Sequence, residues 1–216
     1  MAAAPAATEG RPDPIGAAGL RPGGVTPRVG AWLVDSEIVG LLTLALWVGL
    51  AGRLDPLATP VFLALTFTAA SFAYFVLLWS GDARATFGMR VFRLKVGHAF
   101  DGAVLTPTQA ARRWLALGGP IPLLYGIPGL GGIVWLAALA WGMALLLSTS
   151  RSATRQGPHD RFAGSIVVGP PGWSISAFGC LVVALLMVVV PIVVLFAVAV
   201  LVGVLRELLS GIAAAA

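Results

Sequence analysis

The sequence predicts an all-α membrane protein, a multi-pass helical bundle of about five membrane segments with a small cytoplasmic β-element. Two observations on composition predict this class. Of the 216 residues, 58% are hydrophobic and only 11% are charged, against roughly 45–50% and 25% in ordinary soluble domains. The mean hydropathy is +0.94, and long runs of the chain carry no charge. These values exclude a soluble globular domain, a disordered chain and a fibrous protein.

The first part of the chain predicts a tail followed by a helical hairpin. Residues 1–27 are rich in Ala, Gly and Pro and contain no apolar run long enough for a signal peptide, so we expect a flexible N-terminal tail. Two apolar runs follow, 29–51 and 61–79, and each is long enough to cross about 30 Å of hydrocarbon. Because only residues 52–60 separate the two runs, they should form neighbouring antiparallel helices.

Residues 80–113 are polar and basic, and they contain a period-two pattern at 91–96 before a turn at Asp101-Gly102. Alternation of this kind is typical of a half-buried strand. We therefore expect a small amphipathic β-element at the membrane surface.

Residues 115–147 form an uncharged run that is too long for one crossing, because a single helix would measure about 50 Å. Gly and Pro residues at 118–122 and 126–129 favour breaks there. The sequence therefore predicts a short arm, 115–127, followed by a full span, 129–147.

The distribution of positive charge favours the same hairpin. With it, all fourteen Lys and Arg residues except Arg53 and Arg206 lie on the cytoplasmic side, as the positive-inside rule requires. We expect a protein of the cell (inner or cytoplasmic) membrane with its N-terminus in the cytoplasm. The last uncharged run, 174–205, predicts one tilted helix kinked at Pro191. It contains the single cysteine, Cys180, so no internal disulfide can form.

Two acids lie in the first predicted helix, where an ionised carboxylate is costly. Asp35 follows Arg28 by seven residues, which places both on one helix face about 10 Å apart along the axis. A third group or a water has to link them, or each pairs with another segment. Glu37 is rotated about 200° from Asp35 and is expected to face the short arm or the headgroups.

A second polar group, His159 and Asp160, follows the fourth predicted segment. One imidazole and one carboxylate make neither a closed zinc site nor a nucleophile triad. We therefore expect no catalytic residue, no metal site and no cofactor, and we do not expect an enzyme. Asp160 is expected to pair with Arg28 or with another basic residue.

Three separated motifs together resemble the RDD family of prokaryotic membrane proteins, which is named for one arginine and two aspartates. They are residues 27–35, residues 86–96 with the later Asp101-Gly102 and Arg113, and residues 159–168. The resemblance implies that Arg28, Asp35 and Asp160 are this chain's copies of the three named residues. Two departures from the family pattern are Ser165, where Thr is usual, and Met89, where Lys is common.

The resemblance covers 28–169 as a membrane domain and leaves 170–216 as an additional C-terminal transmembrane helix and tail. It also implies that a strand at 165–168 pairs with 92–96, which is possible only on one side of the membrane. This pairing would bring Asp160 toward Arg28. We therefore expect a polar network of Arg28, Asp35, His159 and Asp160.

Two functions remain open at this point. In the first, the chain is a structural or accessory component whose Arg and Asp network locks its helices. In the second, it is a small cation/proton transporter in which Asp35 alternates between a proton and a cation. The expected partners are the lipid bilayer and, through the C-terminal helix, a second copy or another membrane protein. Nucleic acid is not expected, because the basic residues lie beside apolar runs.

Overall fold

The computed structural model describes residues 21–50 and 58–170, together with part of the residues between 176 and 204. It divides into two compact units, residues 1–175 and residues 176–216. The functional candidates all lie in the first unit.

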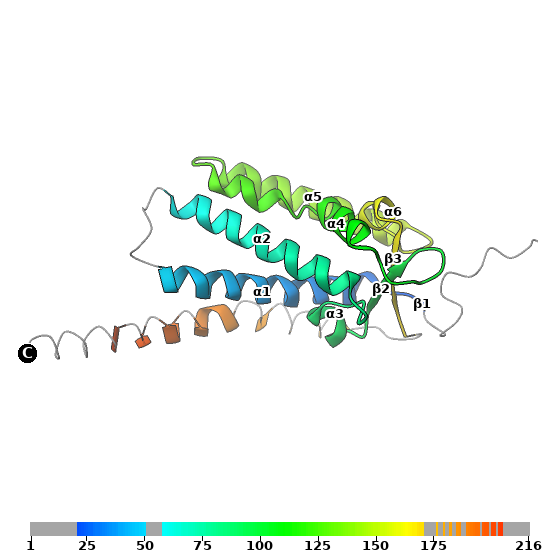
Figure 1. Ribbon diagram of the computed structural model, residues 1–216, viewed down its shortest axis with the longest axis horizontal. Coiled ribbons are helices and arrows are strands. Elements are labelled where there is room, and N and C mark those ends of the chain that lie inside the picture. Colours follow the sequence, from blue (N-terminus) through cyan, green and yellow to red (C-terminus); the bar gives the residue numbers. More distant parts are fainter. Residues whose placement is uncertain are drawn as a thin grey trace, which may run out of the picture. The chain divides into compact units, whose positions relative to one another are not determined.

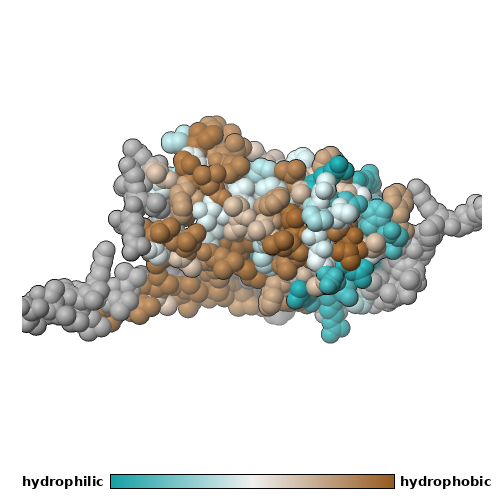
Figure 2. Space-filling model, viewed as in Figure 1, coloured by the Kyte–Doolittle hydropathy of each residue, from teal (hydrophilic) through white to brown (hydrophobic). Residues whose placement is uncertain are grey.

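Three helices of the described chain are long and apolar enough to cross a membrane. They are α1 (Val25–Leu50), α2 (Thr59–Ser80) and α5 (Gly131–Arg151), which lie side by side in Figure 1. Few of their large apolar side chains are buried in the isolated chain, and apolar side chains form the brown surface in Figure 2. An apolar exterior of this extent is expected of helices that face lipid.

The short arm differs from the prediction, and five membrane segments are not confirmed. Helix α4 (Pro107–Ala116) begins at a capping box formed by Thr106 and Gln109. After it the chain forms turns and a 3-10 helix, η2 (Ile121–Gly126), rather than an α-helical arm.

Two glycines explain this irregular course. Gly118 adopts a φ of +92°, which a residue with a side chain rarely adopts. Gly119 lies directly on the indole of Trp114, because a Cβ there would be 2.1 Å from a ring atom. Prolines at 120 and 122 add to the break.

The arm nevertheless leads from α4 toward the opposite end of the bundle, and α5 leads back, as in the predicted hairpin. At one end Arg113 of α4 contacts Asp160, which follows α5. At the other end Gly126 lies against Val61 at the beginning of α2. The polar segments before and after this hairpin therefore meet at one end of the bundle, which we call the sheet end.

A three-stranded antiparallel sheet lies at the sheet end. Its strands are β1 (Arg21–Pro22), β2 (Lys95–His98) and β3 (Ser165–Gly169), in the order β1-β3-β2. In the register of β2 and β3, Val96 lies opposite Val167. Both valines are buried, together with Leu94 and Leu105, so the sheet end has an apolar core of its own.

The pairing of the β-element with β3 was predicted, but its first strand begins later than expected. Residues 87–91 form a short helix, α3 (Phe87–Val91), which Thr86 caps by accepting a hydrogen bond from the backbone N–H of Met89. Arg93 then adopts a φ of 54°, in the left-handed region that ends helices. Strand β2 can start only after this turn.

The N-terminal boundary also differs from the expected tail. Helix α1 begins at Val25, and Arg21 and Pro22 already pair with Gly169 and Val168. Residues 1–20 lie outside the described residues, as does Cys180. The predicted helix 174–205 is described only in part, and its described residues from 179 to 204 are helical.

Candidate functional site

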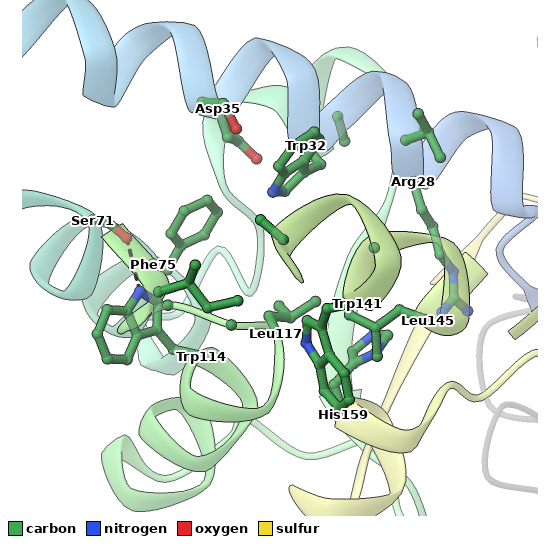
Figure 3. A pocket seen from close by; sticks show the side chains of 18 of the residues that line it. Arg28, Trp32, Asp35, Ser71, Phe75, Trp114, Leu117, Trp141, Leu145 and His159 are labelled. Carbon is green, nitrogen blue, oxygen red and sulfur yellow. Dashed lines mark hydrogen bonds between the residues drawn. The ribbon is translucent and has the colours of Figure 1, made fainter. Parts of the chain in front are cut away.

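Asp35 lies on α1 with its carboxylate buried, and three donors from other segments bind it. Tyr74 Oη donates to Oδ1 at 2.7 Å, and Thr86 Oγ1 donates to Oδ2 at 2.6 Å. The backbone N–H of Gly88 donates to Oδ1 at 2.7 Å. We call these four residues the Asp35 cluster. Figure 3 shows Asp35 on α1, one side of a cavity.

The Asp35 cluster explains the position of α3. A Cβ on Gly88 would lie 2.2 Å from the carbonyl oxygen of Ala31 and 2.9 Å from the carboxyl carbon of Asp35. Only glycine therefore lets the start of α3 come close enough to donate its N–H to Asp35. The contact fixes the surface element against the first membrane helix.

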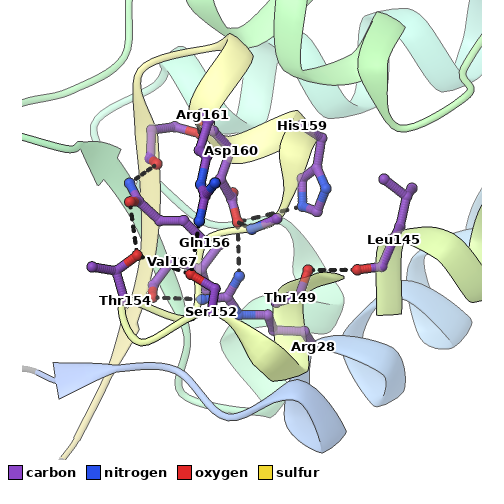
Figure 4. A network of polar contacts seen from close by, with 12 residues as sticks. Arg28, Leu145, Thr149, Ser152, Thr154, Gln156, His159, Asp160, Arg161 and Val167 are labelled. Atoms are coloured by element: carbon purple, nitrogen blue, oxygen red, sulfur yellow. Dashed lines mark hydrogen bonds and ion pairs between the residues drawn. The ribbon is translucent and has the colours of Figure 1, made fainter. Parts of the chain in front are cut away.

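Asp160 lies on α6 (Pro158–Phe162) and is completely buried. Arg28 Nη1 donates to Oδ2 at 2.9 Å, and Arg113 Nη1 donates to Oδ1. The backbone N–H of Gly157 also donates to Oδ2, at 3.1 Å. Figure 4 shows Arg28 reaching Asp160 from α1.

The two arginines connect Asp160 to β3. Arg28 Nη2 donates to the carbonyl oxygen of Val167 at 3.1 Å, and Arg113 Nη1 donates to Ser165 Oγ at 2.8 Å. The Arg113 guanidinium also lies over the ring of Trp79, 4.9 Å from its centroid. The Asp160 cluster, which we define as Arg28, Arg113, Asp160 and Ser165, thus joins α1, α4, α6 and β3.

The electrostatics of this cluster favour an ionised Asp160. Burial alone would raise the pKa of the Asp160 carboxyl, but the adjacent Arg113 and Arg28 outweigh burial and hold the pKa well below its usual value. His159 is next to Asp160, with Nε2 at 3.5 Å from Oδ2. Burial lowers the pKa of His159 to about 4 in spite of that carboxylate, so its imidazole is neutral at pH 7.

The predicted pairing of Arg28 with Asp160 is present, but the expected single network is two clusters. None of the three donors to Asp35 is Arg28, since they are the hydroxyl groups of Tyr74 and Thr86 and the backbone N–H of Gly88. His159 lies beside Asp160 at the sheet end. Glu37 is half-buried on α1 and points away from both clusters.

Sequence reasoning missed Arg113 as the second partner of Asp160, and Tyr74 and Thr86 as partners of Asp35. A signal was present for two of them, since Thr86 and Arg113 both lie in the motif that carries the family resemblance. Tyr74 has no such signal, because it lies in an apolar helix among other aromatic residues.

A cavity of about 570 Å³ lies between α1, α2, α5 and the irregular arm. Its wall is mainly apolar, and Arg28, Arg113 and His159 line it at the sheet end. Asp35 and Ser71 also line it, and Ser71 Oγ accepts a hydrogen bond from Trp114 Nε1 at 2.8 Å. Within the described chain no three His, Cys, Asp or Glu side chains lie close enough to hold a metal ion.

The comparison with protein families gives one match, the model of the RDD family, over residues 22–164. This range includes Arg28, Asp35, Arg113 and Asp160 and ends just before β3. No curated protein and no solved structure matches the chain.

Proposed function

Because the chain belongs to the RDD family of membrane proteins, we propose that it is a structural or accessory component of the membrane rather than an enzyme. Its Arg and Asp contacts hold a surface sheet on a bundle of apolar helices. One observation carries the proposal: the completely buried Asp160 binds arginines from two different helices, and those arginines in turn bind β3. Buried pairs of this kind specify geometry in several known systems.

The Asp35 cluster supports the same function. A carboxylate that exchanges protons and cations needs free hydrogen-bonding capacity and access to water. Asp35 is only 2% exposed and already accepts three short hydrogen bonds. Each donor belongs to α2 or to the segment around α3, so these bonds hold the surface element on α1.

The sheet end is proposed to face the cytoplasm of a cell membrane. Hydrophilic residues gather at that end in Figure 2. Basic residues there outnumber acidic ones, and positively charged loops are retained on the cytoplasmic side. Outside the Asp160 cluster, the basic residues at this end include Arg84, Arg90, Arg93, Lys95, Arg112, Arg151, Arg155 and Arg161, against the acidic residues Asp82 and Asp101.

A cation/proton transporter is the second candidate, and one observation favours it. Asp35 has no cationic side chain among its hydrogen-bond partners, and it lines a cavity inside the bundle. Carboxylates within membrane segments often mark proton pathways in pumps and transporters.

Proton flux in proteoliposomes decides between these two functions. The assay compares wild type, Asp35→Asn and empty vesicles under a sodium or potassium gradient, with Glu37→Gln as the control for a carboxylate on the other face of α1. We expect equal flux in all four samples. Cation-dependent flux in wild type and Glu37→Gln that is lost in Asp35→Asn would refute the structural function and establish the transporter.

A further inference from the structure

The cavity between the helices has the depth of one membrane leaflet. Along α1 its lining runs from Val25 to Val39, and along α5 from Trp135 to Thr149. Fourteen helical rises measure about 21 Å. One leaflet contributes about 15 Å of hydrocarbon, and the headgroup region adds several more. The cavity therefore extends from the sheet end to about the middle of the bilayer.

The chemistry of the cavity changes along this depth. Its deeper wall is apolar and aromatic, with Phe67, Trp135 and Leu139 among the lining residues. Helices α1 and α5, which form two sides of the cavity, make few contacts with each other. A site of 570 Å³ falls in the range of pockets that hold one small ligand or one chain of a larger one.

The shallow end of the cavity carries cationic and polar side chains that do not make all the hydrogen bonds available to them. Arg28, Arg113 and His159 line it, and Arg113 and His159 are 5% and 7% exposed. Within the described chain, Nε of both arginines and Nδ1 of His159 are buried without a hydrogen-bond partner. Buried nitrogens of this kind usually bind a partner.

The charge count at this end points to an anion. Two guanidinium groups face one carboxylate, that of Asp160, and Arg155 lies close enough to repel Arg28. Asp35 also lines the cavity, but it lies about 10 Å further along α1 and its oxygens are occupied by their own donors. Within the Asp160 cluster, two arginines thus share the single negative charge of Asp160.

We propose that this cavity binds a phospholipid with an anionic headgroup. Its phosphate lies at Arg28, Arg113 and His159, and one acyl chain lies along the apolar wall between α1 and α5. Phosphate oxygens accept hydrogen bonds from guanidinium groups with favourable geometry. The depth of the cavity favours a lipid over a water-soluble anion as the ligand, because a free phosphate would leave the apolar part of the cavity empty.

Native mass spectrometry of the full chain tests this proposal. The protein is purified in mild detergent and titrated with phosphatidylglycerol, with phosphatidylcholine and with inorganic phosphate. We expect one phosphatidylglycerol per chain, bound about tenfold more tightly than phosphatidylcholine. Both lipids carry the phosphate, but the choline group of the second brings a further positive charge to an end of the cavity where two guanidinium groups already face one carboxylate. Equal retention of the two lipids, or retention of inorganic phosphate to the same extent, would refute the proposal.

Two glycines of α5 provide a matched pair of variants that spare the polar groups. Gly142 lines the cavity and Gly132 does not, and a Cβ at either position meets no atom within 4 Å. Gly142→Phe should fill the cavity and abolish binding, whereas Gly132→Phe should bind as wild type does. Binding that is equal in the two variants would place the lipid on the outer surface and overturn the proposal. Ala138→Phe, also at the cavity wall, serves in place of Gly142→Phe if that variant does not fold.

Discussion

The replacement of Asp160 by Asn isolates the charge of the Asp160 cluster while keeping its volume. The wild-type carboxylate is completely buried and binds two arginines from different helices. Removing one partner of a buried ion pair costs about 3–5 kcal/mol, since the remaining charge stays buried and unpaired. Here two guanidinium groups lose their counter-charge, so we expect the upper part of that range. For a chain of this size it corresponds to a fall in melting temperature of roughly 10 °C.

The measurement is thermal unfolding of the purified full chain in detergent, with Asp101→Asn as the control. Asp101 also contacts another polar side chain, with Oδ1 at 2.8 Å from Nδ1 of His98, but the Asp101 side chain is 65% exposed, so its replacement should change the melting temperature little. If Asp160→Asn melts no lower than Asp101→Asn, the reasoning about the buried cluster is refuted.

The difference in melting temperature between wild type and Asp160→Asn should depend on pH, in the direction given by the pKa shift of Asp160. The pKa of Asp160 is lower in the folded chain than its ordinary value of 3.8. Its contribution to stability is therefore fully present above that ordinary value and is lost as the pH falls toward the folded pKa. The difference in melting temperature between wild type and Asp160→Asn should stay constant from about pH 8 to about pH 5 and narrow below about pH 4.

Two further predictions concern His159 and Gly88. The pKa of His159 is lowered from 6.5 to about 4, so the unfolded chain binds more protons than the folded chain between these two pH values. The free energy of unfolding should therefore fall by about 3 kcal/mol as the pH drops through this window. The melting temperature of His159→Gln should fall less than that of wild type over the same window, and an equal fall would contradict the prediction. Gly88→Ala should displace α3 from α1, because a Cβ has no room there, and should lower the melting temperature by several degrees. Gly132→Ala, at a position with open space around it, is its control, and equal melting of the two variants would show that α3 does not depend on this close approach.

The membrane helices could be predicted from the sequence because their signal is local. An uncharged apolar run of about twenty residues suffices, and the runs predicted at 29–51, 61–79 and 129–147 correspond to α1, α2 and α5. The short arm could not be predicted in the same way. Its apolar composition is that of a helix, whereas its backbone is set by Gly118 and Gly119 and by the packing of Gly119 on Trp114.

The polar contacts were predicted only in part because they join segments that are far apart in the chain. Arg28 and Asp160 were expected to pair, but composition and spacing do not show that Arg113 shares the same carboxylate. The later start of β2 has the same cause. Residues 91–96 alternate as a strand does, yet Asp35, more than fifty residues earlier, accepts the N–H of Gly88 and stabilises a helical turn there.

The order in which the ribosome releases the chain gives the sheet a consequence for biogenesis. Strand β3 is the central strand of the sheet and the last of the three to be synthesised. Arg28 and its carboxylate partner are 132 residues apart, so α1, α2 and α4 all emerge before either arginine can be neutralised. Assembly of this end must therefore wait until translation passes residue 169, and a chain stalled before that point would leave β1 and β2 without the strand that both of them pair with.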